Sequence, residues 1–341
     1  MADRSNVMCS VCVANYNGKT YLRECIDSII SQNIDKQIEI IVHDDASTDD
    51  SVEFLKRCYP DIIVIQSKVN CGFCISNNRM VEVAKGEYIL LLNNDAVLRK
   101  DAIKTLYNAS RKYGTGIFGL PQYNAQTNHL IDMGSLLDPF LNPIPNTTST
   151  VQNVGMIIGA CLWLPKSLWK TLGGFPDWFG SMAEDMYLCC LARLRGIQVK
   201  AVAYSGFDHW VGRSFGGGKI MSNGKLSTTL KRRVISERNK SFVMILCYPS
   251  PLAWILVPFN LLLLCIEGGL LSLIKMDTRL WSKIYWHCLK EIWKDRRMLK
   301  EKRRLIQKTR RCSVIGFFNP FQWVPYKLSM LLKYGLPHID N

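Results

Sequence analysis

The chain reads VMCSVCVANYN from Val7 to Asn17, an apolar run that changes abruptly to amides and a tyrosine. Three further apolar runs follow, and segments with helical spacing separate them. We expect strands at Val7–Ala14, Ile38–Val42, Ile62–Ile65 and Tyr88–Leu92, and helices at Tyr21–Ile30, Ser51–Cys58 and Ser76–Ala84. Apolar strands that alternate with helices indicate an α/β protein with a Rossmann-like, mostly parallel twisted sheet covered on both faces.

Polar residues follow each of these four strands. They are Asn15-Tyr16-Asn17, Asp44-Asp45, Asn70 and Asn93-Asn94-Asp95. The carboxyl ends of parallel strands meet at one edge of a sheet, and ligands of open α/β sheets bind there. The sequence therefore predicts a binding site at this edge.

The pattern of strands and helices continues to about residue 210. We expect a strand within Met156–Leu164, a helix from about Lys166, a helix at Asp185–Leu194 and a strand at Gln198–Tyr204 that ends close to His209. The glycines Gly216-Gly217-Gly218 predict a mobile loop.

The 341 residues carry a formal net charge of +15, and most of that charge is local. The stretch from Lys275 to Arg311 holds fourteen Lys/Arg and four Asp/Glu, which gives 14 − 4 = +10. A basic block beside apolar sequence indicates an anionic membrane surface. Nucleic acid, the competing partner, is not expected, because no recognition motif accompanies the block.

Cysteine usage and the N-terminus indicate a reducing compartment. Thirteen cysteines are scattered without a framework spacing, and the first residues lack the apolar region of a signal peptide. The pairs Cys9/Cys12 and Cys71/Cys74 have zinc-like spacing. Cys9 and Cys12 lie in a predicted strand, where positions three apart face opposite sides, so we favour buried free thiols over a zinc site.

The character of the sequence changes after Lys240. Ser241 to Ile274 contains a single charge, Glu267, and Pro258 and Gly268-Gly269 interrupt its longest apolar run. Basic residues flank both sides and favour the cytoplasmic face. We therefore expect a hairpin or interfacial helices at the membrane, with a soluble core helix as the alternative.

The aromatic and basic mixture from Trp281 to Arg311 predicts a helix on a membrane surface, with an ordinary solvated helix as the alternative. We divide the chain into a catalytic domain, residues 1–240, and a membrane-associated tail, residues 241–341. The predicted location is the cytoplasmic face of a membrane, and homo-oligomers are left open.

Two carboxylates at the predicted edge suit ligand binding. Asp44 can accept hydrogen bonds from a base or a ribose, and Asp95 is a good ligand for Mg²⁺. The alternatives are a helix cap and a strand-end cap. We expect Ser47 to Asp49 to cap the helix at residue 51 while Asp44 binds.

An ordered series of motifs from about residue 7 to 215 resembles the family 2 glycosyltransferases of GT-A fold, which bind nucleotide sugars. The matching stretches are Val13–Asn17, Asp44–Asp49, Asn70–Phe73 with Asn77-Asn78, Leu92–Asp95, Gly159-Ala160, Leu172–Phe175, Glu184-Asp185 and His209. The likeness is greatest to a rhamnosyltransferase-like branch that serves surface-polysaccharide assembly.

The resemblance implies roles for these residues. Asp44 would hold the nucleobase, Asp95 and His209 would hold Mg²⁺ or Mn²⁺ at the diphosphate, and Asp185, beside Glu184, would be the base. The donor-binding set would be completed by Ala14, Tyr16, Asp45, Asn70, Asn78, Asn93, Asn94 and Ser214. One departure is that the usual Asp-x-Asp motif reads Asn93-Asn94-Asp95, so its first carboxylate is replaced by an amide.

The implied chemistry needs one base and no acid. A nucleoside diphosphate leaves readily once a divalent cation neutralises its growing charge. Asp185 would remove the proton of the incoming hydroxyl in a single displacement that inverts the anomeric centre. The adjacent charge of Glu184 would raise one pKa of the pair, although acidic residues are also common in the first turn of ordinary helices.

We predict that the protein transfers a sugar from a nucleotide donor to a lipid-linked or glycan acceptor. The resemblance to the rhamnosyltransferase-like branch suggests rhamnose as that sugar. One alternative is a catalytically idle nucleotide-sugar-binding scaffold of the same fold, against which the Asp95 and Glu184-Asp185 carboxylates argue. Another is a sugar-phosphate nucleotidyltransferase. That class needs a Gly-rich basic loop after the first strand, where this chain has Asn15-Tyr16-Asn17-Gly18-Lys19.

Overall fold

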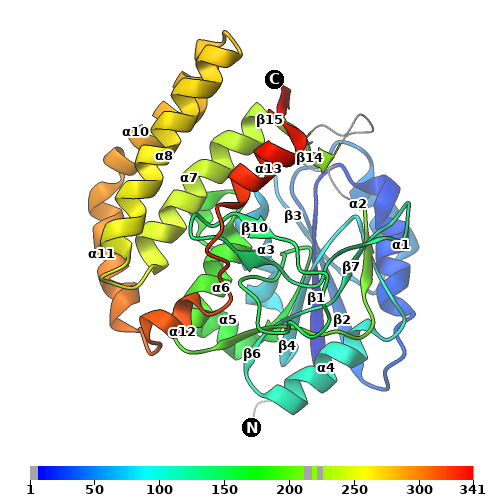
Figure 1. Cartoon of the computed structure of the whole chain (residues 1–341). Helices are drawn as coiled ribbons and strands as arrows, with labels where there is room; N and C mark the ends of the chain where they lie inside the picture. Colours follow the sequence, from blue (N-terminus) through cyan, green and yellow to red (C-terminus); the bar gives the residue numbers. More distant parts are fainter. Residues whose placement is uncertain (1–6, 211–216, 221–225, 341) are drawn as a thin grey trace. The chain divides into compact units, whose positions relative to one another are not determined.

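The computed structural model describes residues 7–210, 217–220 and 226–340 (Figure 1). The chain forms two compact units. The first comprises Met1–Ser135, Pro145–Ala192 and Ile197–Trp210, and the second comprises Leu136–Ile144, Arg193–Gly196 and Val211–Asn341. The predicted boundary after residue 240 falls inside a helix of the second unit, α7 (Leu230–Cys247), and β13 ends the first unit at about residue 210.

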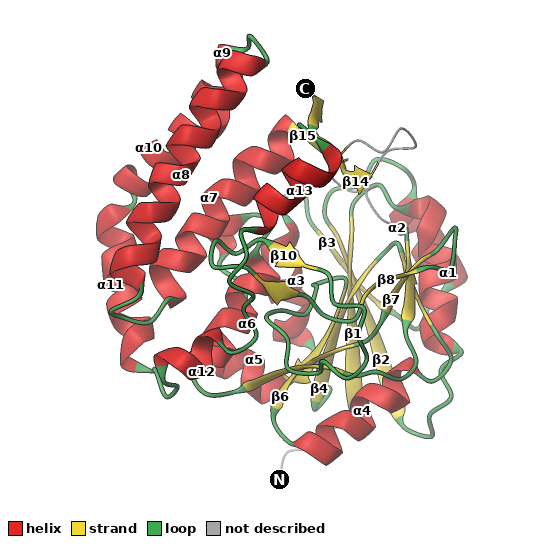
Figure 2. Cartoon of the chain, in the orientation of Figure 1, coloured by secondary structure: helices red, strands yellow, loops and turns green. Residues whose placement is uncertain are grey.

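A seven-stranded sheet in the order β12-β6-β11-β4-β1-β2-β3 forms the centre of the first unit (Figure 2). Its strands are β1 (Val7–Asn15), β2 (Gln37–Asp44), β3 (Ile63–Gln66), β4 (Tyr88–Asn93), β6 (Gly116–Gly119), β11 (Cys161–Pro165) and β12 (Gln198–Ala201). β1 pairs in parallel with β2 and β4, and β2 pairs in parallel with β3. β11 runs antiparallel to β4 and β6. The predicted α/β class is confirmed.

Helices cover both faces of this sheet. They are α1 (Lys19–Ile30), α2 (Ser51–Cys58), α3 (Phe73–Val83), α4 (Ala102–Tyr113), α5 (Lys166–Leu172), η1 (Asp177–Phe179) and α6 (Glu184–Leu194). In Figure 1, α1 and α2 lie to one side of the sheet and α3 and α5 to the other. All four predicted strands and three predicted helices of the first hundred residues are present, with ends shifted by a few residues.

Burial on both faces explains why β1 stays central. Val11, Cys12 and Val13 are fully buried, and so is Leu90 on the neighbouring β4. Burying an aliphatic side chain of this size contributes roughly 1.5–3 kcal/mol. The strand therefore stops where its apolar residues stop, which leaves Asn15 at the sheet edge.

A second, four-stranded sheet in the order β5-β13-β7-β8 lies within the first unit. Its strands are β5 (Ala96–Leu98), β7 (Gln122–Asn124), β8 (Leu130–Asp132) and β13 (Phe207–His209). β13 is antiparallel to β5 and parallel to β7. Because these strands have only three residues each, their apolar pattern is too short to be recognised in the sequence.

The second unit is mainly helical in the part of the chain that is described. Its helices are α7, α8 (Ala253–Ile274), α9 (Thr278–Leu280), η2 (Trp281–Trp286), α10 (His287–Lys294), α11 (Arg296–Lys308), α12 (Val314–Phe318) and α13 (Tyr326–Tyr334). Its strands are β9 (Leu136–Leu137), β10 (Pro143–Ile144), β14 (Gly217–Ile220), β15 (Leu226–Thr229) and β16 (His338–Asp340). Gly217 and Gly218, predicted to be loop, therefore belong to a strand, and Gly216 lies outside the described residues.

The predicted hairpin in residues 241–274 is wrong, because α8 is one unbroken helix of 22 residues with Pro258 inside it. By length and composition α8 is long and apolar enough to cross a membrane, which is weak evidence on its own. Gly268 is required within this helix because the Tyr285 ring packs closely against the backbone there. A Cβ there would lie 2.6 Å from the Tyr285 ring.

Candidate active site

Three strand ends meet through one amide. The Asn15 side chain donates to Asp44 Oδ2 at 2.8 Å and accepts from Asn94 Nδ2 at 2.7 Å. The sheet register places Asn15 beside Asp44, because β1 and β2 pair in parallel to their last residues. The predicted convergence of polar clusters is confirmed for the ends of β1, β2 and β4.

Gly18 makes room for this amide cluster. A Cβ on Gly18 would lie 2.0 Å from Asn94 Nδ2 and 2.4 Å from Asn15 Oδ1. Any side chain at this position would displace the two amides. The close approach of the Asn15 and Asn94 side chains to the backbone therefore requires a glycine at position 18.

The two neighbouring aspartates have different surroundings. Asp44 is buried, and it accepts from Ser47 N–H at 3.0 Å as well as from Asn15. Asp45 accepts from the backbone N–H groups of Cys71 and Gly72, both at 2.8 Å. Asp45 therefore fixes the loop that leads into α3, and Asp44 is the carboxylate that belongs to the amide cluster.

The expected capping role holds only for Asp49, whose Oδ1 accepts from the N–H of Ser51, the first residue of α2, at 3.3 Å. Asp50 occupies the N-cap of α2 and makes no capping hydrogen bond through its side chain. Ser47 Oγ instead accepts from Asn17 N–H at 2.8 Å, and Asp49 Oδ2 accepts from Lys19 N–H at 2.9 Å. These bonds join the loop after β2 to the loop after β1.

Asp95 and His209 are 114 residues apart in the chain and in direct contact. His209 Nε2 lies 3.1 Å from Asp95 Oδ1, and both side chains are buried. The β5–β13 pairing brings them together, because His209 is opposite Ala96. Asn93 adds an amide nitrogen 3.4 Å from Nε2. Three of the predicted site residues therefore form one group.

The donor set of this pair fits a hard divalent cation. With metal–ligand bonds of about 2.1 Å, neighbouring ligands of an octahedral Mg²⁺ lie about 3.0 Å apart. The 3.1 Å separation of His209 Nε2 and Asp95 Oδ1 matches that spacing. One carboxylate and one imidazole leave positions for substrate phosphate oxygens and water.

Gln122 orients the histidine from its other side. The Gln122 amide on β7 lies 2.8 Å from His209 Nδ1 in a buried contact. The structure places the amide nitrogen there; with the amide rotated by 180°, its oxygen would accept from Nδ1–H and Nε2 would keep its lone pair for a cation. Sequence reasoning missed Gln122, since a single glutamine in a three-residue strand carries no pattern.

Replacing Gln122 with leucine is expected to raise the Mn²⁺ concentration for half-maximal activity by roughly 10–100-fold, because partners of this kind fix the ligand's tautomer. The measurement is donor turnover against Mn²⁺ concentration, with Gln126→Leu on the neighbouring exposed turn as control. An unchanged Mn²⁺ dependence would remove Gln122 from the cation site.

Asp185 and Glu184 open α6 on a strained backbone. The two preceding residues, Met182 and Ala183, have φ angles of 66° and 64°. Left-handed backbone costs a non-glycine residue about 1–3 kcal/mol and tends to persist at functional sites. The chain accepts this cost twice in succession immediately before the acidic pair.

Asp185 is connected to the strand ends through the two residues just before β11. Its Oδ2 accepts from Gly159 N–H at 2.8 Å, and the next residue, Ala160, accepts from Asn93 N–H at 3.1 Å. One backbone step therefore links the carboxylate to the Asn93, Asp95 and His209 group. The predicted base and the predicted cation ligands belong to one region of the first unit.

Burial shifts the pKa of both carboxyls in this pair. Desolvation, followed by the charge of Asp185, raises the pKa of Glu184 to about 8. Desolvation also raises the pKa of Asp185, although N–H donation from Gly159 and Met186 opposes the shift. Glu184 Oε2 is buried without a hydrogen-bond partner among the described residues. The pair therefore holds a proton near neutral pH.

The raised pKa of Glu184 predicts a pH-dependent stability. The folded chain binds the proton more tightly than the unfolded chain, so this contribution is complete below about pH 4.5 and is lost as the pH rises through about 8. Glu184→Gln is expected to flatten the fall in melting temperature between pH 6 and 8. Melting curves of both proteins across this range test it, and an equal fall in both would contradict the assignment.

The remaining predicted donor-binding residues lie outside these hydrogen-bonded groups. Asn70 and Tyr16 are exposed in their loops, Ala14 is half-buried in β1, and Ser214 falls outside the described residues. Asn78 donates to Phe175 O at 2.8 Å and to Asp177 Oδ1 at 2.7 Å. Its amide fixes the loop after α5, and direct contact of these residues with a donor stays a prediction.

A second group resembles a metal site by composition. Ligand atoms of His43, Asp45 and Cys71 lie within 4.8 Å of one another. However, Arg79 Nη1 lies 3.4 Å from His43 Nε2 and 3.6 Å from Cys71 Sγ. A guanidinium therefore already supplies the positive charge there, and the group does not fit a cation.

Comparison with known proteins gives the family and the fold. The model of glycosyl transferase family 2 matches residues 10–172. The poly(ribitol-phosphate) beta-glucosyltransferase of Bacillus spizizenii is 36% identical over 108 residues, which are 30% of this chain and 17% of that protein. The uncharacterized glycosyltransferase RT0329 of Rickettsia typhi is 30% identical over 176 residues, 49% of this chain and 53% of that protein. The chain thus matches less than two thirds of either relative's length.

Among solved structures, GalNAc-T7 with UDP, GalNAc and Mn²⁺ has a TM-score of 0.57 and 16% identity, and the match covers 72% of this chain and 49% of that one. That likeness shows the fold alone. The family match includes the strand ends at Asn15, Asp44 and Asn93 and the backbone partner of Asp185, Gly159. Residues 10–172 therefore match glycosyl transferase family 2, and the chain has the GT-A fold.

Proposed function

We propose that this protein transfers a sugar from a nucleoside-diphosphate donor to an acceptor hydroxyl with inversion at the anomeric carbon. The observation that carries the proposal is the meeting of two groups in the first unit. A cation-binding pair, Asp95 with His209, is linked to the buried carboxylate Asp185 by two hydrogen bonds, from Gly159 N–H to Asp185 and from Asn93 N–H to Ala160. This arrangement supports both leaving-group stabilisation and proton removal.

On the donor side, Asp44 and its amide partners would receive the nucleoside. The Asp44 carboxylate is held by Asn15 and Ser47 N–H, so its position is fixed before the donor arrives. Asn94 is held through Asn15 as well. A pre-organised edge of this kind avoids reorganisation during the reaction. The other proposed donor contacts are Tyr16, Asn70, Asn78, Asn93 and Ser214. Ser214 would clamp the diphosphate.

Asp95 and His209 would hold Mg²⁺ or Mn²⁺. The bound cation would neutralise the negative charge that develops on the departing diphosphate. Gln122, with its amide oxygen toward Nδ1, would keep the imidazole in the tautomer that this role needs. The single carboxylate of Asn93-Asn94-Asp95 suffices, because substrate phosphates provide the other oxygens.

Asp185 would remove the proton of the acceptor hydroxyl as that oxygen attacks. Its two oxygens accept from Gly159 and Met186 N–H, which fixes the side chain's direction. Desolvation raises its pKa above the ordinary aspartate value, and a stronger base results. Glu184, which holds a proton more tightly, would leave Asp185 as the ionised member of the pair.

We propose a lipid-linked or glycan acceptor at the cytoplasmic face of a membrane, and no nucleic-acid partner. A catalytically idle scaffold is disfavoured by the strained backbone before Glu184 and Asp185, which simple binding would not require. The rhamnose prediction has no support among the relatives reported above, one of which is named a glucosyltransferase.

The decisive experiment is a screen of nucleotide sugars with Mg²⁺ or Mn²⁺ for thermal stabilisation. A donor that binds only the folded chain raises the melting temperature by mass action. UDP-glucose and dTDP-rhamnose belong in the first set. The expected result is stabilisation by one donor that requires the divalent cation. Stabilisation by none, with or without cation, would refute the proposal.

A further inference from the structure

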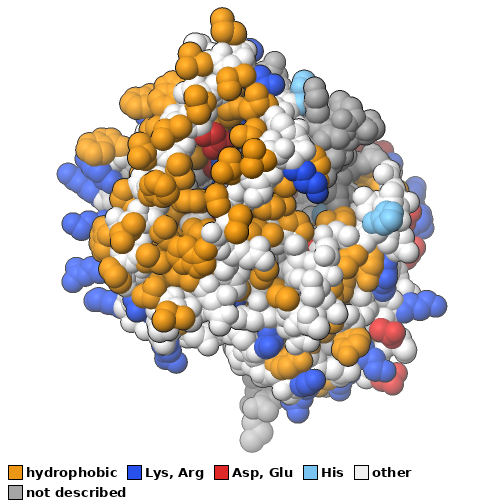
Figure 3. Space-filling model, in the orientation of Figure 1, with side chains coloured by type: hydrophobic (Ala, Val, Ile, Leu, Met, Phe, Trp, Pro, Cys, Tyr) orange, Lys and Arg blue, Asp and Glu red, His pale blue; other side chains and the backbone are white. Residues whose placement is uncertain are grey.

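α8 has two faces along its whole length. Its buried positions recur every three or four residues: Ala253, Leu256, Asn260, Leu264, Gly268 and Leu271. The opposite positions are large, apolar and 48–72% exposed: Trp254, Ile255, Phe259, Leu262, Ile266, Leu270, Leu273 and Ile274. Figure 3 shows hydrophobic side chains gathered over this helix. An apolar stripe of this length on a surface marks an interaction site.

The buried face of α8 packs against charged helices. α8 contacts α7 and η2, and α7 contributes Arg233, Glu237 and Lys240 as buried residues. A transverse α8 would bring these charges to the depth of the hydrocarbon. Charges at that depth are unfavourable. The packing therefore favours an orientation in which only the outer face of α8 meets an apolar phase.

α13 adds a second apolar stripe. Leu328, Leu331 and Leu332 lie three and four residues apart and are 51%, 41% and 81% exposed. Within the described chain this helix has no buried residue at all. Trp323 and Val324, just before it, are also more than half exposed. Apolar burial thus does not hold α13 in place.

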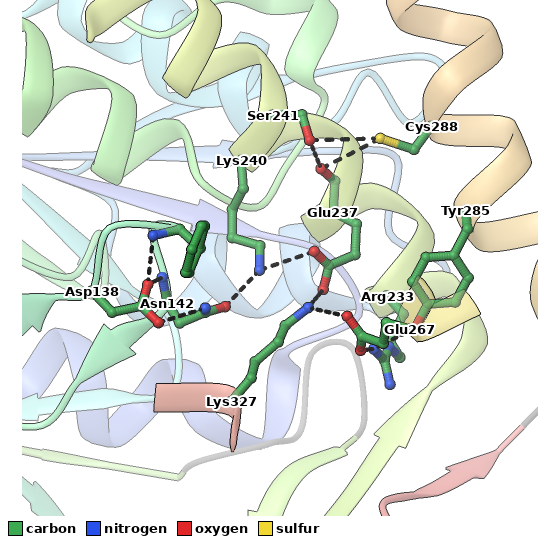
Figure 4. A network of polar contacts seen from close by, with 11 residues as sticks. Asp138, Asn142, Arg233, Glu237, Lys240, Ser241, Glu267, Tyr285, Cys288 and Lys327 are labelled. Carbon is green, nitrogen blue, oxygen red and sulfur yellow. Dashed lines mark hydrogen bonds and ion pairs between the residues drawn. The ribbon is translucent and has the colours of Figure 1, made fainter. Parts of the chain in front are cut away.

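Ion pairs hold α13 instead, through Lys327. Its Nζ lies 2.7 Å from Glu237 on α7 and 3.0 Å from Glu267 on α8. Figure 4 shows Lys327 between these two carboxylates, with Arg233 on the far side of Glu267. Lys327 also cancels charge on Glu267, the one acidic residue of α8. A single side chain joins the two apolar stripes.

The carboxylate that anchors Lys327 is itself firmly ionised. Burial works to raise the pKa of Glu237, but three neighbouring cations hold it far below its ordinary value. One of them, Lys240, donates to Asn142 at 2.9 Å, and Asn142 donates to Asp138. Asp138 also accepts from the N–H of Tyr326, the first residue of α13. The start of α13 is therefore fixed twice.

Basic residues border the apolar stripes. The exposed ones on α10 and α11 are Lys290, Lys294, Arg296, Arg297, Lys300, Lys302, Arg304 and Lys308. In Figure 3, Lys and Arg side chains gather along the edge beside α8. This combination of an apolar face and a cationic border complements an anionic bilayer surface, which attracts each such cation.

We infer that the outer residues of α8 together with Leu328, Leu331 and Leu332 of α13 form one docking face for an anionic phospholipid bilayer, with α8 lying in the plane of the interface. Lys327 holds the two helices in register. The inference gives a physical form to the membrane location in the proposed function, but it requires neither donor nor acceptor. Its test is therefore independent of catalysis.

The first test is flotation of the full-length protein with phosphatidylglycerol-containing vesicles and with pure phosphatidylcholine vesicles. Leu262→Glu and Leu332→Glu are each expected to lower the vesicle-bound to free ratio by about tenfold or more, since each places a charge in the apolar contact. Ile30→Glu, an equally exposed site on α1, is the control with no change expected. Undiminished binding by both docking-face variants would overturn the inference.

The second test separates Lys327 from charge in general. Lys327→Met and Lys333→Met remove one positive charge each from α13, but only Lys327 bridges Glu237 and Glu267. Lys327→Met is expected to lose severalfold more vesicle binding than Lys333→Met. Melting temperatures in detergent check that both variants are folded. Equal losses would overturn the role of Lys327.

The third test concerns orientation. Lys275 follows α8 directly and is exposed. When the protein is added outside sealed vesicles, an impermeant amine reagent added to the same side is expected to label Lys275. Protection of Lys275 alone among the exposed lysines would mean that α8 crosses the bilayer and would overturn the in-plane arrangement. Self-association through these leucines, seen by sedimentation without vesicle binding, would overturn the choice of partner.

Discussion

Asp185→Asn is expected to lower kcat by roughly 10²–10⁴-fold, the usual contribution of a positioned general base. The amide cannot take the acceptor's proton, while the diphosphate end of the site is unchanged. KM for the donor is therefore expected to stay within a few fold of the parent value. The measurement is steady-state turnover of the donor identified by the nucleotide-sugar screen, with its matching acceptor.

The variant must also be shown to fold. Asp185 accepts two backbone N–H groups, and an amide can accept only one of them, which costs about 1–3 kcal/mol for the buried group left unpaired. Melting temperature with and without donor separates this loss from a loss of chemistry. Asp101→Asn, at a side chain without a capping bond before α4, is the matched control. Full activity of Asp185→Asn would end its assignment as the base.

The pH profile of the parent enzyme offers a second view of the same carboxylate. Desolvation raises the pKa of Asp185, so kcat is expected to rise with pH through a value above 3.8, the ordinary pKa of an aspartate. Because the base works only when it is ionised, kcat rises and does not fall as the pH increases. Glu184 keeps its proton in the range where Asp185 ionises, so Glu184→Gln is expected to leave that limb close to its place in the parent enzyme.

The strands that form the site could be predicted because each is a continuous apolar run that ends in polar residues. Val7–Ala14 was expected and Val7–Asn15 is observed, and the added residue is the amide that joins Asp44 to Asn94. Parallel pairing then brings the strand ends together without further information. The family resemblance supplied Asp185 and His209, which local pattern alone would not single out.

The partners of those residues could not be predicted, because tertiary pairing creates them. Gln122 reaches His209 only through the pairing of two three-residue strands, β7 and β13. Gly159 donates its backbone N–H to Asp185, and a backbone donor of this kind cannot be recognised from the residue type. A sequence shows which side chains can do chemistry more readily than it shows which neighbours orient them.

The tail shows the opposite error, in which local signals were given too much weight. Pro258, Glu267 and Gly268 each suggested a break in the apolar run, yet α8 continues through all three. Arg233 and Lys327 pair with Glu267, and Gly268 admits the Tyr285 ring. Tyr285 itself, expected at a membrane surface, is buried, whereas Trp286 and Trp293 are exposed. Contacts distant in sequence decided each case.

Asp95→Asn is expected to lower kcat/KM by about a thousandfold, since loss of a cation's stabilisation of the leaving group is worth several kcal/mol. The amide keeps a hydrogen bond to His209 but removes the only charged ligand of the pair. Donor turnover across Mn²⁺ concentrations measures the change, and excess Mn²⁺ is expected to restore part of it. Asp208→Asn, on the same β13 as His209 and paired with Arg99, is the matched control. If Asp95→Asn kept the parent's activity and Mn²⁺ dependence, the cation would have to bind elsewhere, and the proposed leaving-group chemistry would lose its foundation.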